Sequence, residues 1–520
     1  MKIAIAQLNY RSGRIEENTK MILQAIEKAK KGRAELIVFP ELAICGTGAH
    51  DLLEKEYFIN NCRMAIEKIA THCNTIAAII GGPNLDAESG IMYDSAYFLQ
   101  NGEVVDGVHK TILSDYDTID ESRYFIAGED NTPIKYKNQN IRILFDEYEA
   151  DYIERTDHLV IHIGITPFTT ESLSYKQATW SQIAQKNNKT IISVNSSGAN
   201  TSVVFDGNSM VFNPKGKIVV KLKDFEENFI VVDTSASLPA INIPETDRIA
   251  LIHKALVAGI RDYFTKNGFS KAILGLSGGI DSAVVAALAA EALGHENVMG
   301  ILMPSEYSTD HSVQDALDLA KNIGMPHETM PIKDIYTQYL QTLQPQFKNQ
   351  PFNVAEENLQ ARIRGGLVMA ISNKFGNIPL NTSNKSEAAV GYGTLYGDLC
   401  GSMSVIGDVY KTDVFRLARH INRNKTIIPE NTITKAPSAE LRPNQKDQDS
   451  LPEYDVLDAI LNLYIEENVS PEAIIAKGFD KNIVEKTIRL VNASEYKRAQ
   501  CPPNIKISKK AFGRGRRMPF

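Results

Sequence analysis

Cysteine is scarce in this 520-residue chain, and it is unevenly spread. The five cysteines form no CxxC pair, which excludes a disulfide framework and a cysteine-based zinc site and is typical of a reduced, cytoplasmic protein. Positions 74–399 contain no thiol at all, so that stretch cannot supply a cysteine nucleophile. The cysteines are Cys45, Cys62, Cys73, Cys400 and Cys501.

Long apolar runs and an excess of positive charge are also missing. The most apolar stretch, Ala283–Leu293, contains Glu291 and is too short to cross a bilayer. Met1–Tyr10 has the alternation of a strand rather than the shape of a signal peptide. A formal charge of −7 argues against a surface that binds polyanions. We therefore expect no membrane and no nucleic-acid partner.

The chain is long enough to predict more than one domain. In the first half, Glu16–Lys31 has apolar residues at helical spacing, and it lies between segments with strand patterns, as expected for an α/β layer fold. Residues 236–248 contain two prolines and several polar residues, which is typical of a linker. We predict a domain over residues 1–235, this linker, and a second domain over residues 249–520.

A glycine-rich turn near the middle of the chain joins a short apolar strand to a helix rich in alanine and leucine. The first N–H groups of a helix lack intrahelical partners, and the helix dipole adds positive charge, so the turn suits an anion. Glycines let the backbone approach a phosphate, the serines add hydroxyl donors, and Asp281 suits a bridging cation. The spacing differs from the GxxxxGK[ST] phosphate loop. The predicted nucleotide-binding residues here are Leu276, Ser277, Gly278, Gly279, Ile280, Asp281 and Ser282.

Strand and helix patterns continue to alternate after this loop, at residues 298–303 and 312–323. Short connections of this kind predict parallel strands with right-handed crossovers, and such a sheet binds ligands at the carboxyl ends of its strands. The loop at residues 276–282 lies at such an end.

The Ser-Gly-Gly-x-Asp-Ser loop resembles that of the ATP pyrophosphatases. Clusters at 356–365, 381–398 and 437–443 make the second half similar to NAD synthetases. The resemblance implies a Rossmann-like doubly wound parallel sheet, ATP as co-substrate and Mg²⁺ as cofactor. It implies that the carboxylate of deamido-NAD attacks the α-phosphorus of ATP, and that ammonia then converts the acyl-adenylate into NAD and AMP.

The same resemblance assigns roles to individual residues. It implies ATP contacts at Thr382, Lys411 and Ser438 in addition to the loop, and magnesium at Asp281 and Glu387. It implies contacts with deamido-NAD at Asn358, Arg362, Lys385, Glu387 and Lys497, where Asn358 and Arg362 share one helical face.

The first half resembles the nitrilase superfamily, which implies an α/β sandwich. Its glutaminase members use a glutamate base, a lysine that stabilises the oxyanion and a cysteine nucleophile; Phe39-Pro40-Glu41-Leu42 and His109-Lys110 match the first two motifs. The third motif fails, because Asp146 stands at the cysteine position, and a carboxylate attacks amides poorly. The surrounding pocket motifs also depart, at Thr166, Ser196 and residues 200–202.

We therefore predict a glutaminase domain that has lost its activity, with ammonia as the direct nitrogen donor and a separate glutaminase as one source of it. Three alternatives stay open. The first is a glutamine-hydrolysing NAD synthetase with an unrecognised nucleophile, for which Cys45 is the first candidate because it follows Glu41 closely. The second is another ATP pyrophosphatase, thiolating or GMP-forming, and the third is a non-catalytic nucleotide sensor.

Two further expectations concern assembly and the chain end. The resemblance implies a homo-oligomer, a dimer or larger. The segment 506–517 has six basic residues and no acid. Such a tail is either a solvated end or a segment that folds over the nucleotide site or a partner subunit.

Overall fold

The computed structural model describes residues 1–200, 202–244, 246–348 and 350–519, and the chain forms two compact units, Met1–Glu245 and Thr246–Phe520. Each unit is described by itself. In the part of the chain that the structure describes, no helix combines the length and the apolar character that crossing a membrane requires.

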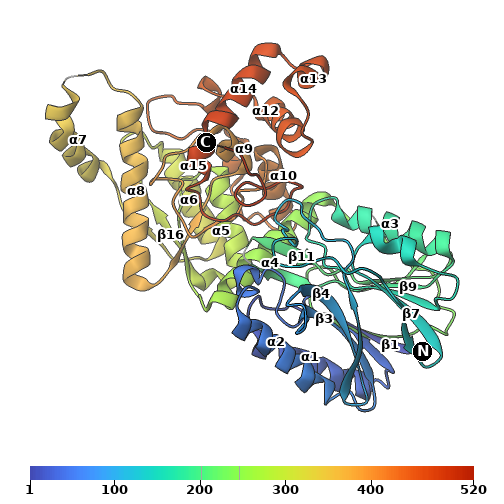
Figure 1. The fold of residues 1–520 in the computed structure, drawn as a ribbon. Coiled ribbons are helices and arrows are strands. Elements are labelled where there is room, and N and C mark those ends of the chain that lie inside the picture. Colours follow the sequence, from blue (N-terminus) through green and yellow to red (C-terminus); the bar gives the residue numbers. More distant parts are fainter. Residues whose placement is uncertain (201, 245, 349, 520) are drawn as a thin grey trace. The chain divides into compact units, whose positions relative to one another are not determined.

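The first unit contains two six-stranded sheets. One has the order β14-β1-β2-β3-β4-β5 and the other β13-β12-β9-β8-β7-β6. In Figure 1, α1 and α2 lie along the first sheet and α3 along the second. The strands of the first sheet are β1 (Lys2–Gln7), β2 (Leu36–Val38), β3 (Ala77–Leu85), β4 (Met92–Gln100), β5 (Glu103–His109) and β14 (Asn228–Asp233). The second contains β6 (Ile134–Tyr136), β7 (Gln139–Leu144), β8 (Leu159–His162), β9 (Ile191–Ser193), β12 (Met210–Phe212) and β13 (Ile218–Lys221).

Alternation along the strands explains this layered arrangement. In β1, Ile3 and Ile5 join the core between the two sheets, whereas Ala4 and Ala6 face the core under the helices. Because side chains of a strand point alternately to its two faces, one apolar strand serves both cores. The predicted nitrilase-like sandwich is confirmed. The covering helices are α1 (Ile15–Lys31), α2 (Glu56–Ala70) and α3 (Ser172–Asn187), and a small ribbon pairs β10 (Ser197–Asn200) with β11 (Val203–Asp206).

The second unit is built on a five-stranded sheet of order β17-β16-β15-β18-β19, in which every pairing is parallel. The chain runs outward from β15 to β17 and then returns to β18 on the other side of β15. The crevice between β15 and β18 is therefore the switch point where such sheets bind ligands. The strands are β15 (Ala272–Gly275), β16 (Val298–Leu302), β17 (His327–Thr329), β18 (Ile378–Asn381) and β19 (Met403–Ser404). The predicted parallel-sheet fold is confirmed.

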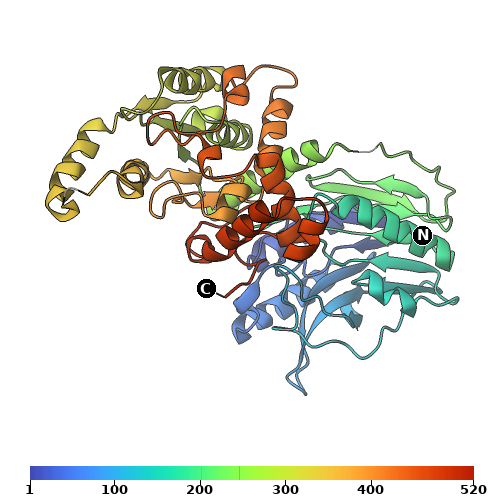
Figure 2. The same cartoon turned by 90° about the horizontal axis from the view of Figure 1, so that it is seen from above.

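Helices cover both faces of this sheet, as the two views in Figures 1 and 2 show. On one face, α8 buries Ile363 and Val368 against Ile273 and Ile301 of the strands. The α-helices of the whole second unit are α4 (Arg248–Asn267), α5 (Ile280–Leu293), α6 (Asp310–Ile323), α7 (Lys333–Phe347), α8 (Val354–Phe375), α9 (Lys385–Val390), α10 (Lys411–Ile421), α11 (Glu430–Thr434), α12 (Tyr454–Leu461), α13 (Pro471–Ala476), α14 (Lys481–Ala493) and α15 (Glu495–Arg498).

Backbone geometry at the loop between β15 and α5 explains why glycine stands at position 278. Gly278 has a φ of +77°, and a Cβ there would meet the carbonyl oxygen of Ser312 at 2.1 Å. Both the left-handed conformation and the close approach require a residue without a side chain.

We expect Gly278→Ala to lower the free energy of unfolding by more than the roughly 1–2 kcal/mol of left-handed strain alone, because the Cβ also collides with backbone. Gly268→Ala is the matched control, since Gly268 has a φ of +74° and open space around its missing Cβ. Urea denaturation of both variants makes the comparison. Equal losses would show that the contact with Ser312 has no energetic weight.

Candidate active sites

Three ionisable residues meet at the ends of strands in the first unit. Glu41 follows β2 and Lys110 follows β5; the Lys110 ammonium lies 2.8 Å from Oε1 of Glu41 and 2.8 Å from Oε1 of Glu121. Ile165 N donates to the other oxygen of Glu41 at 2.8 Å. The side chains of Glu41 and Lys110 are nearly inaccessible. The structure thus brings the predicted Glu41 and Lys110 together and adds Glu121.

Burial and charge act in opposite directions in this cluster. Burial by itself lowers the pKa of Lys110, but the carboxylates of Glu41 and Glu121 outweigh it and raise that pKa above its ordinary value. Burial, followed by the neighbouring Glu41 charge, raises the pKa of Glu121 to about 7. The cluster therefore holds one firmly protonated lysine and more carboxylates than that lysine neutralises.

Asp94 of β4 is a fourth member of the cluster. Its side chain is fully buried, and neither carboxylate oxygen has a hydrogen-bond partner among the described residues. Ligand atoms of Asp94, Glu41 and Glu121 lie within 4.8 Å of one another. Burial and then the Glu41 charge raise the pKa of Asp94 well above its ordinary value. Because Lys110 already bridges Glu41 and Glu121, we do not interpret the three carboxylates as a metal centre.

Asp146 follows β7 and begins the 3₁₀ helix η2 (Glu147–Tyr152), where its Oδ1 accepts the Tyr148 N–H at 2.9 Å. Its nearest link to the cluster is Tyr116. Partial desolvation and then the Asp146 carboxylate raise the pKa of that phenol, whereas Lys110 opposes the shift. Glu149 of this 3₁₀ helix accepts the Thr111 N–H at 2.8 Å, so η2 is hydrogen-bonded to the residue after Lys110, and Asp146 acts as the cap of that helix.

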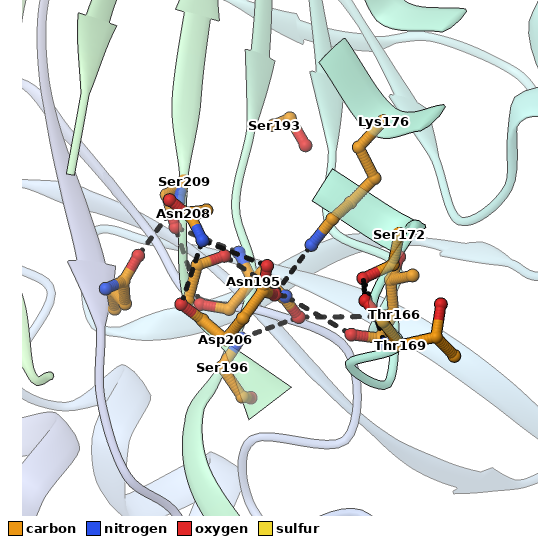
Figure 3. Close-up of polar contacts among 12 residues, drawn as sticks. Thr166, Thr169, Ser172, Lys176, Ser193, Asn195, Ser196, Asp206, Asn208 and Ser209 are labelled. Atoms are coloured by element: carbon orange, nitrogen blue, oxygen red, sulfur yellow. Dashed lines mark hydrogen bonds and ion pairs between the residues drawn. The ribbon is translucent and has the colours of Figure 1, made fainter. Parts of the chain in front are cut away.

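A buried polar network lies beside this cluster at the ends of β8, β9 and β11 (Figure 3). Lys176 projects from α3 to Oδ1 of Asp206 at 2.7 Å, and Asp206 also accepts from Asn195 and Asn208. Asn195 Oδ1 in turn accepts the backbone N–H groups of Thr166 and Ser196. These two pocket positions are therefore held by the network through their backbones. Asn200 is the last residue of β10, Ser202 lies between β10 and β11, and Thr201 lies outside the described residues.

Cys45, the candidate alternative nucleophile, is fully buried, and its thiol is directed to the carbonyl of Leu42 at 3.7 Å. The neighbouring Cys62 thiol and burial raise its pKa well above the ordinary value. A thiol in this environment is protonated and inert, since the thiolate is the attacking species.

In the second unit, the loop between β15 and α5 is tied together by its own serines. Ser277 Oγ lies 3.1 Å from Ser282 Oγ and accepts the Gly279 N–H at 3.2 Å, and Ser282 Oγ donates to the Gly279 carbonyl at 3.0 Å. The loop lies at the carboxyl end of β15, beside the switch point, and opens into the N-terminus of α5. This is the anion-binding geometry that the sequence predicts.

The loop after β18 meets it across the switch point. Asn384, the N-cap of α9, donates to Oδ1 of Asp281 at 2.9 Å. Lys411, the first residue of α10, lies 2.5 Å from Oδ2 of Asp281 and 3.2 Å from Oε1 of Glu387. The structure therefore brings together Asp281, Glu387 and Lys411, which are far apart in the sequence.

The electrostatics of this trio favour an added cation. Burial by itself lowers the pKa of Lys411, but the charges of Asp281 and Glu387 raise that pKa above its ordinary value. Burial raises the pKa of Glu387 to about 8, although the Lys411 charge acts to lower it. A pKa of about 8 keeps Glu387 largely protonated at neutral pH, and a divalent cation beside it would favour the ionised carboxylate. Mg²⁺ is held in proteins by one or two carboxylates together with substrate phosphates, and these residues fit that donor set.

The other predicted contacts are arranged around the same end of the sheet. Asn358 Oδ1 accepts from Thr394 Oγ1 at 2.7 Å, and the exposed Arg362 donates to the Leu395 carbonyl at 3.3 Å. Lys497 binds the carbonyls of Gly391 and Gly393, both at 2.8 Å. Ser438 is exposed and donates to the Gln445 carbonyl at 2.6 Å, and Thr382 follows β18 directly.

Lys385 differs from its predicted role. Its side chain is fully buried, and its ammonium donates to Glu466 at 2.7 Å, Ser508 Oγ at 2.7 Å and the Lys510 carbonyl at 2.9 Å. An ammonium has three donors, and all of them are engaged inside the protein. The structure thus favours a structural role for Lys385 over the predicted contact with the nucleotide.

Three residues of these sites escaped the sequence analysis. Glu121 lies eleven positions after Lys110, in a stretch where acidic residues are frequent, so only its contact with the buried ammonium distinguishes it. Asn384 lies within the cluster at 381–398 but has no predicted role of its own, although its side chain donates to Asp281. Arg364 donates through Nε to the Met303 carbonyl at 3.0 Å, beside the loop, and burial lowers the pKa of its guanidinium to about 10.

Comparison with known proteins covers both units. Residues 2–238 match the carbon-nitrogen hydrolase family, and residues 252–501 match the NAD synthase family. The chain is 44% identical to a glutamine-dependent NAD(+) synthetase of Synechocystis, over 100% of this chain and 98% of that protein, and 40% identical to one of Acinetobacter baylyi with the same coverage. The structure of a glutamine-dependent NAD+ synthetase from Acinetobacter baumannii, solved with adenosine diphosphate, shares 38% identity and a TM-score of 0.81 over 100% of this chain and 98% of that one.

A parallel sheet with this phosphate loop, fused in one chain to a nitrilase-like sandwich, defines a ligase that forms a carbon–nitrogen bond at the expense of ATP. The chain belongs to the family of glutamine-dependent NAD(+) synthetases. The names of these relatives favour glutamine rather than free ammonia as their nitrogen source.

The raised pKa of Glu121 predicts a specific pH dependence of stability. An unfolded glutamate ionises near 4.5, whereas Glu121 in the folded protein has a pKa of about 7. The folded state binds the extra proton between these values, so Glu121 makes stability fall as pH rises from about 4.5 to 7. Between pH 5 and pH 8, Glu121→Gln should lose less of its free energy of unfolding than the wild type does, by about 1–3 kcal/mol.

Urea midpoints of the two proteins at both pH values provide the measurement, with the exposed Glu129→Gln as the matched control. If wild type and Glu121→Gln show the same pH dependence, the carboxyl group is ionised at both pH values and the interpretation is wrong.

Proposed function

We propose that this protein amidates deamido-NAD in two steps. The carboxylate oxygen of the substrate attacks the α-phosphorus of ATP, pyrophosphate leaves, and an acyl-adenylate remains. Ammonia then attacks the acyl carbon, AMP leaves, and NAD is the product. The observation that carries the proposal is the junction of the Ser277–Ser282 loop with Asp281, Glu387 and Lys411 at one switch point. The family membership of the chain supports the same reaction.

The residues of the second unit have roles in binding and charge neutralisation. The N–H groups at the start of α5, together with Ser277 and Ser282, hold the departing pyrophosphate. Lys411 neutralises charge on the phosphates, and Asn384 orients Asp281. Asp281 and Glu387 hold Mg²⁺, which when bound offsets the negative charge of the leaving group. Asn358, Arg362 and Lys497 contact deamido-NAD, and Thr382 and Ser438 contact ATP.

We propose ammonia as the direct nitrogen donor. No cysteine lies between Cys73 and Cys400, and Asp146 at the position of the nucleophile caps a helix. The Glu41–Lys110–Glu121 cluster is intact, but a base and an oxyanion donor have no reaction without a nucleophile. The first unit, within the predicted limits 1–235, is then a domain without glutaminase activity, joined by residues 236–248 to a synthetase domain over 249–520.

Glutamine is the second candidate donor, and the names of the relatives favour it. It requires a nucleophile other than Asp146. Cys45 is the nearest thiol in sequence to Glu41, but its burial and raised pKa argue against it. We also propose that the protein forms a homo-oligomer, a dimer or larger, which light scattering in solution tests.

Purified protein should form NAD from ATP, deamido-NAD and ammonium, and at least about 10³-fold more slowly from glutamine, because loss of a nucleophile removes orders of magnitude of rate. The assay follows NAD and pyrophosphate with each donor, and glutamate release with glutamine. Rapid glutamate release would overturn ammonia as the donor. Cys45→Ser would then decide whether that thiol is responsible.

Asp146→Cys should not restore glutamine-dependent synthesis. A new thiol needs a shaped amide pocket as well as a base, and Thr166 and Ser196 depart from the family motifs there. The measurement is glutamate release by the variant, with Asp146→Ser as the control for altered helix capping. Substantial release by Asp146→Cys alone would show that the pocket is intact.

Asp281→Asn should reduce turnover with ammonium by roughly 100-fold or more, since the change keeps the shape of the side chain but removes a charged metal ligand. The exposed Asp334→Asn on α7 is the matched control and should leave turnover unchanged. Circular dichroism checks that both variants fold. Near-normal synthesis by Asp281→Asn would reject this role for the carboxylate.

A further inference from the structure

The basic end of the chain is largely buried in the second unit rather than solvated. We call residues 504–512 the brace. Asn504 forms a parallel bridge with Ser404 of β19, and Ser404 N donates to the Pro503 carbonyl at 2.9 Å. Ile505 and Ile507 are almost completely buried, and Ile505 packs against Gly259 of α4. The brace therefore continues the edge of the central sheet.

Asp408 binds the middle of the brace. Its Oδ2 accepts the backbone N–H groups of Ile507 at 2.7 Å and Ser508 at 2.8 Å, and its Oδ1 accepts from Ser508 Oγ at 2.8 Å. The carboxylate is 1% exposed. A buried carboxylate with three donors is fully satisfied, so each donor has a defined position.

Lys385 completes the arrangement from the other side. Its ammonium lies 2.9 Å from Oδ1 of Asp408 and donates to Ser508 Oγ, Glu466 and the Lys510 carbonyl. The Ser508 hydroxyl bonds to both ions, which also contact each other directly: it accepts from Lys385 and donates to Asp408. Removal of this hydroxyl leaves each ion with one hydrogen bond fewer in a place that water does not reach.

The two ions begin the same segments that carry the nucleotide site. Lys385 is the first residue of α9, two positions before Glu387, and Asp408 stands three positions before Lys411. The segments are joined directly, because Lys385 N donates to the Val409 carbonyl at 2.9 Å and Lys411 N donates to Ser386 Oγ at 2.9 Å. The separation of Glu387 from Lys411 is therefore set where these two segments meet, and the brace binds this same junction through Lys385 and Asp408.

We propose that Ser508 is a positioning residue, through which the brace holds Glu387 and Lys411 at the spacing that binds magnesium and ATP. This inference rests on the proposed function in one respect, the role of these two side chains in binding. By this inference, the brace and Lys385 contribute to ATP binding without contacting ATP.

The test compares Ser508→Ala with Ser508→Thr, which keeps the hydroxyl, and with Lys509→Ala as the neighbouring control, whose ion pair with Glu467 is exposed. Calorimetry with ATP and Mg²⁺, without deamido-NAD, measures binding in the absence of turnover. Ser508→Ala should weaken this binding about tenfold, the scale of effects from residues that support metal ligands, and Ser508→Thr should recover most of it. Lys509→Ala should bind like wild type.

A loss of thermal stability in Ser508→Ala with unchanged binding of ATP and Mg²⁺ would overturn the inference, because it would show a merely structural brace. If Ser508→Ala does not fold, Glu466→Gln serves instead: it keeps the size of the side chain but removes a charge that Lys385 contacts, and it should weaken binding in the same direction. If the proposed function itself is wrong, the wild-type protein will bind ATP with Mg²⁺ but form no NAD, and this result is distinct from those of the variants.

Discussion

The ammonium of Lys411, held between the carboxylates of Asp281 and Glu387, is the interaction on which the synthetase site depends. It joins three segments that are far apart in the sequence: the first turn of α5, the first turn of α9 and the start of α10. Removing one partner of such a buried arrangement typically costs about 3–5 kcal/mol, because the remaining charge stays desolvated. The same trio therefore supports the local fold and provides the charge that phosphates and a divalent cation require.

A second buried lysine, Lys110, organises a cluster of carboxyl groups in the first unit in a similar way. Lys110 bridges Glu41 and Glu121, and the buried Asp94 lies beside them. Each of the charges is buried and hydrogen-bonded to the others or to backbone, so loss of any one destabilises the sandwich even when no chemistry depends on it.

The loop at Ser277–Ser282 shows that a single sequence motif does not form such a site by itself. Its hydroxyls bind one another and its own backbone, and Gly278 fits only because its Cα hydrogen faces the Ser312 carbonyl. Asp281 is directed by Asn384 from across the switch point. Local sequence supplies the donors, but packing against α6 and α9 decides where they point.

The sequence by itself determined the order of strands and helices, the two-domain organisation expected from the resemblance, the phosphate loop and the absence of a thiol at the position of the nucleophile. Periodicity and turn chemistry are local properties, and the absence of a residue type needs no coordinates. Only the tertiary structure decided which charges meet. Glu121, Asn384 and Arg364 looked like ordinary polar residues, and Lys385 looked like a ligand of the nucleotide. Their roles depend on partners more than ten positions away, such as Ser508 for Lys385 and Asp281 for Asn384. Their roles also depend on burial, which changes the energy of a charged group far more than the choice of residue type does.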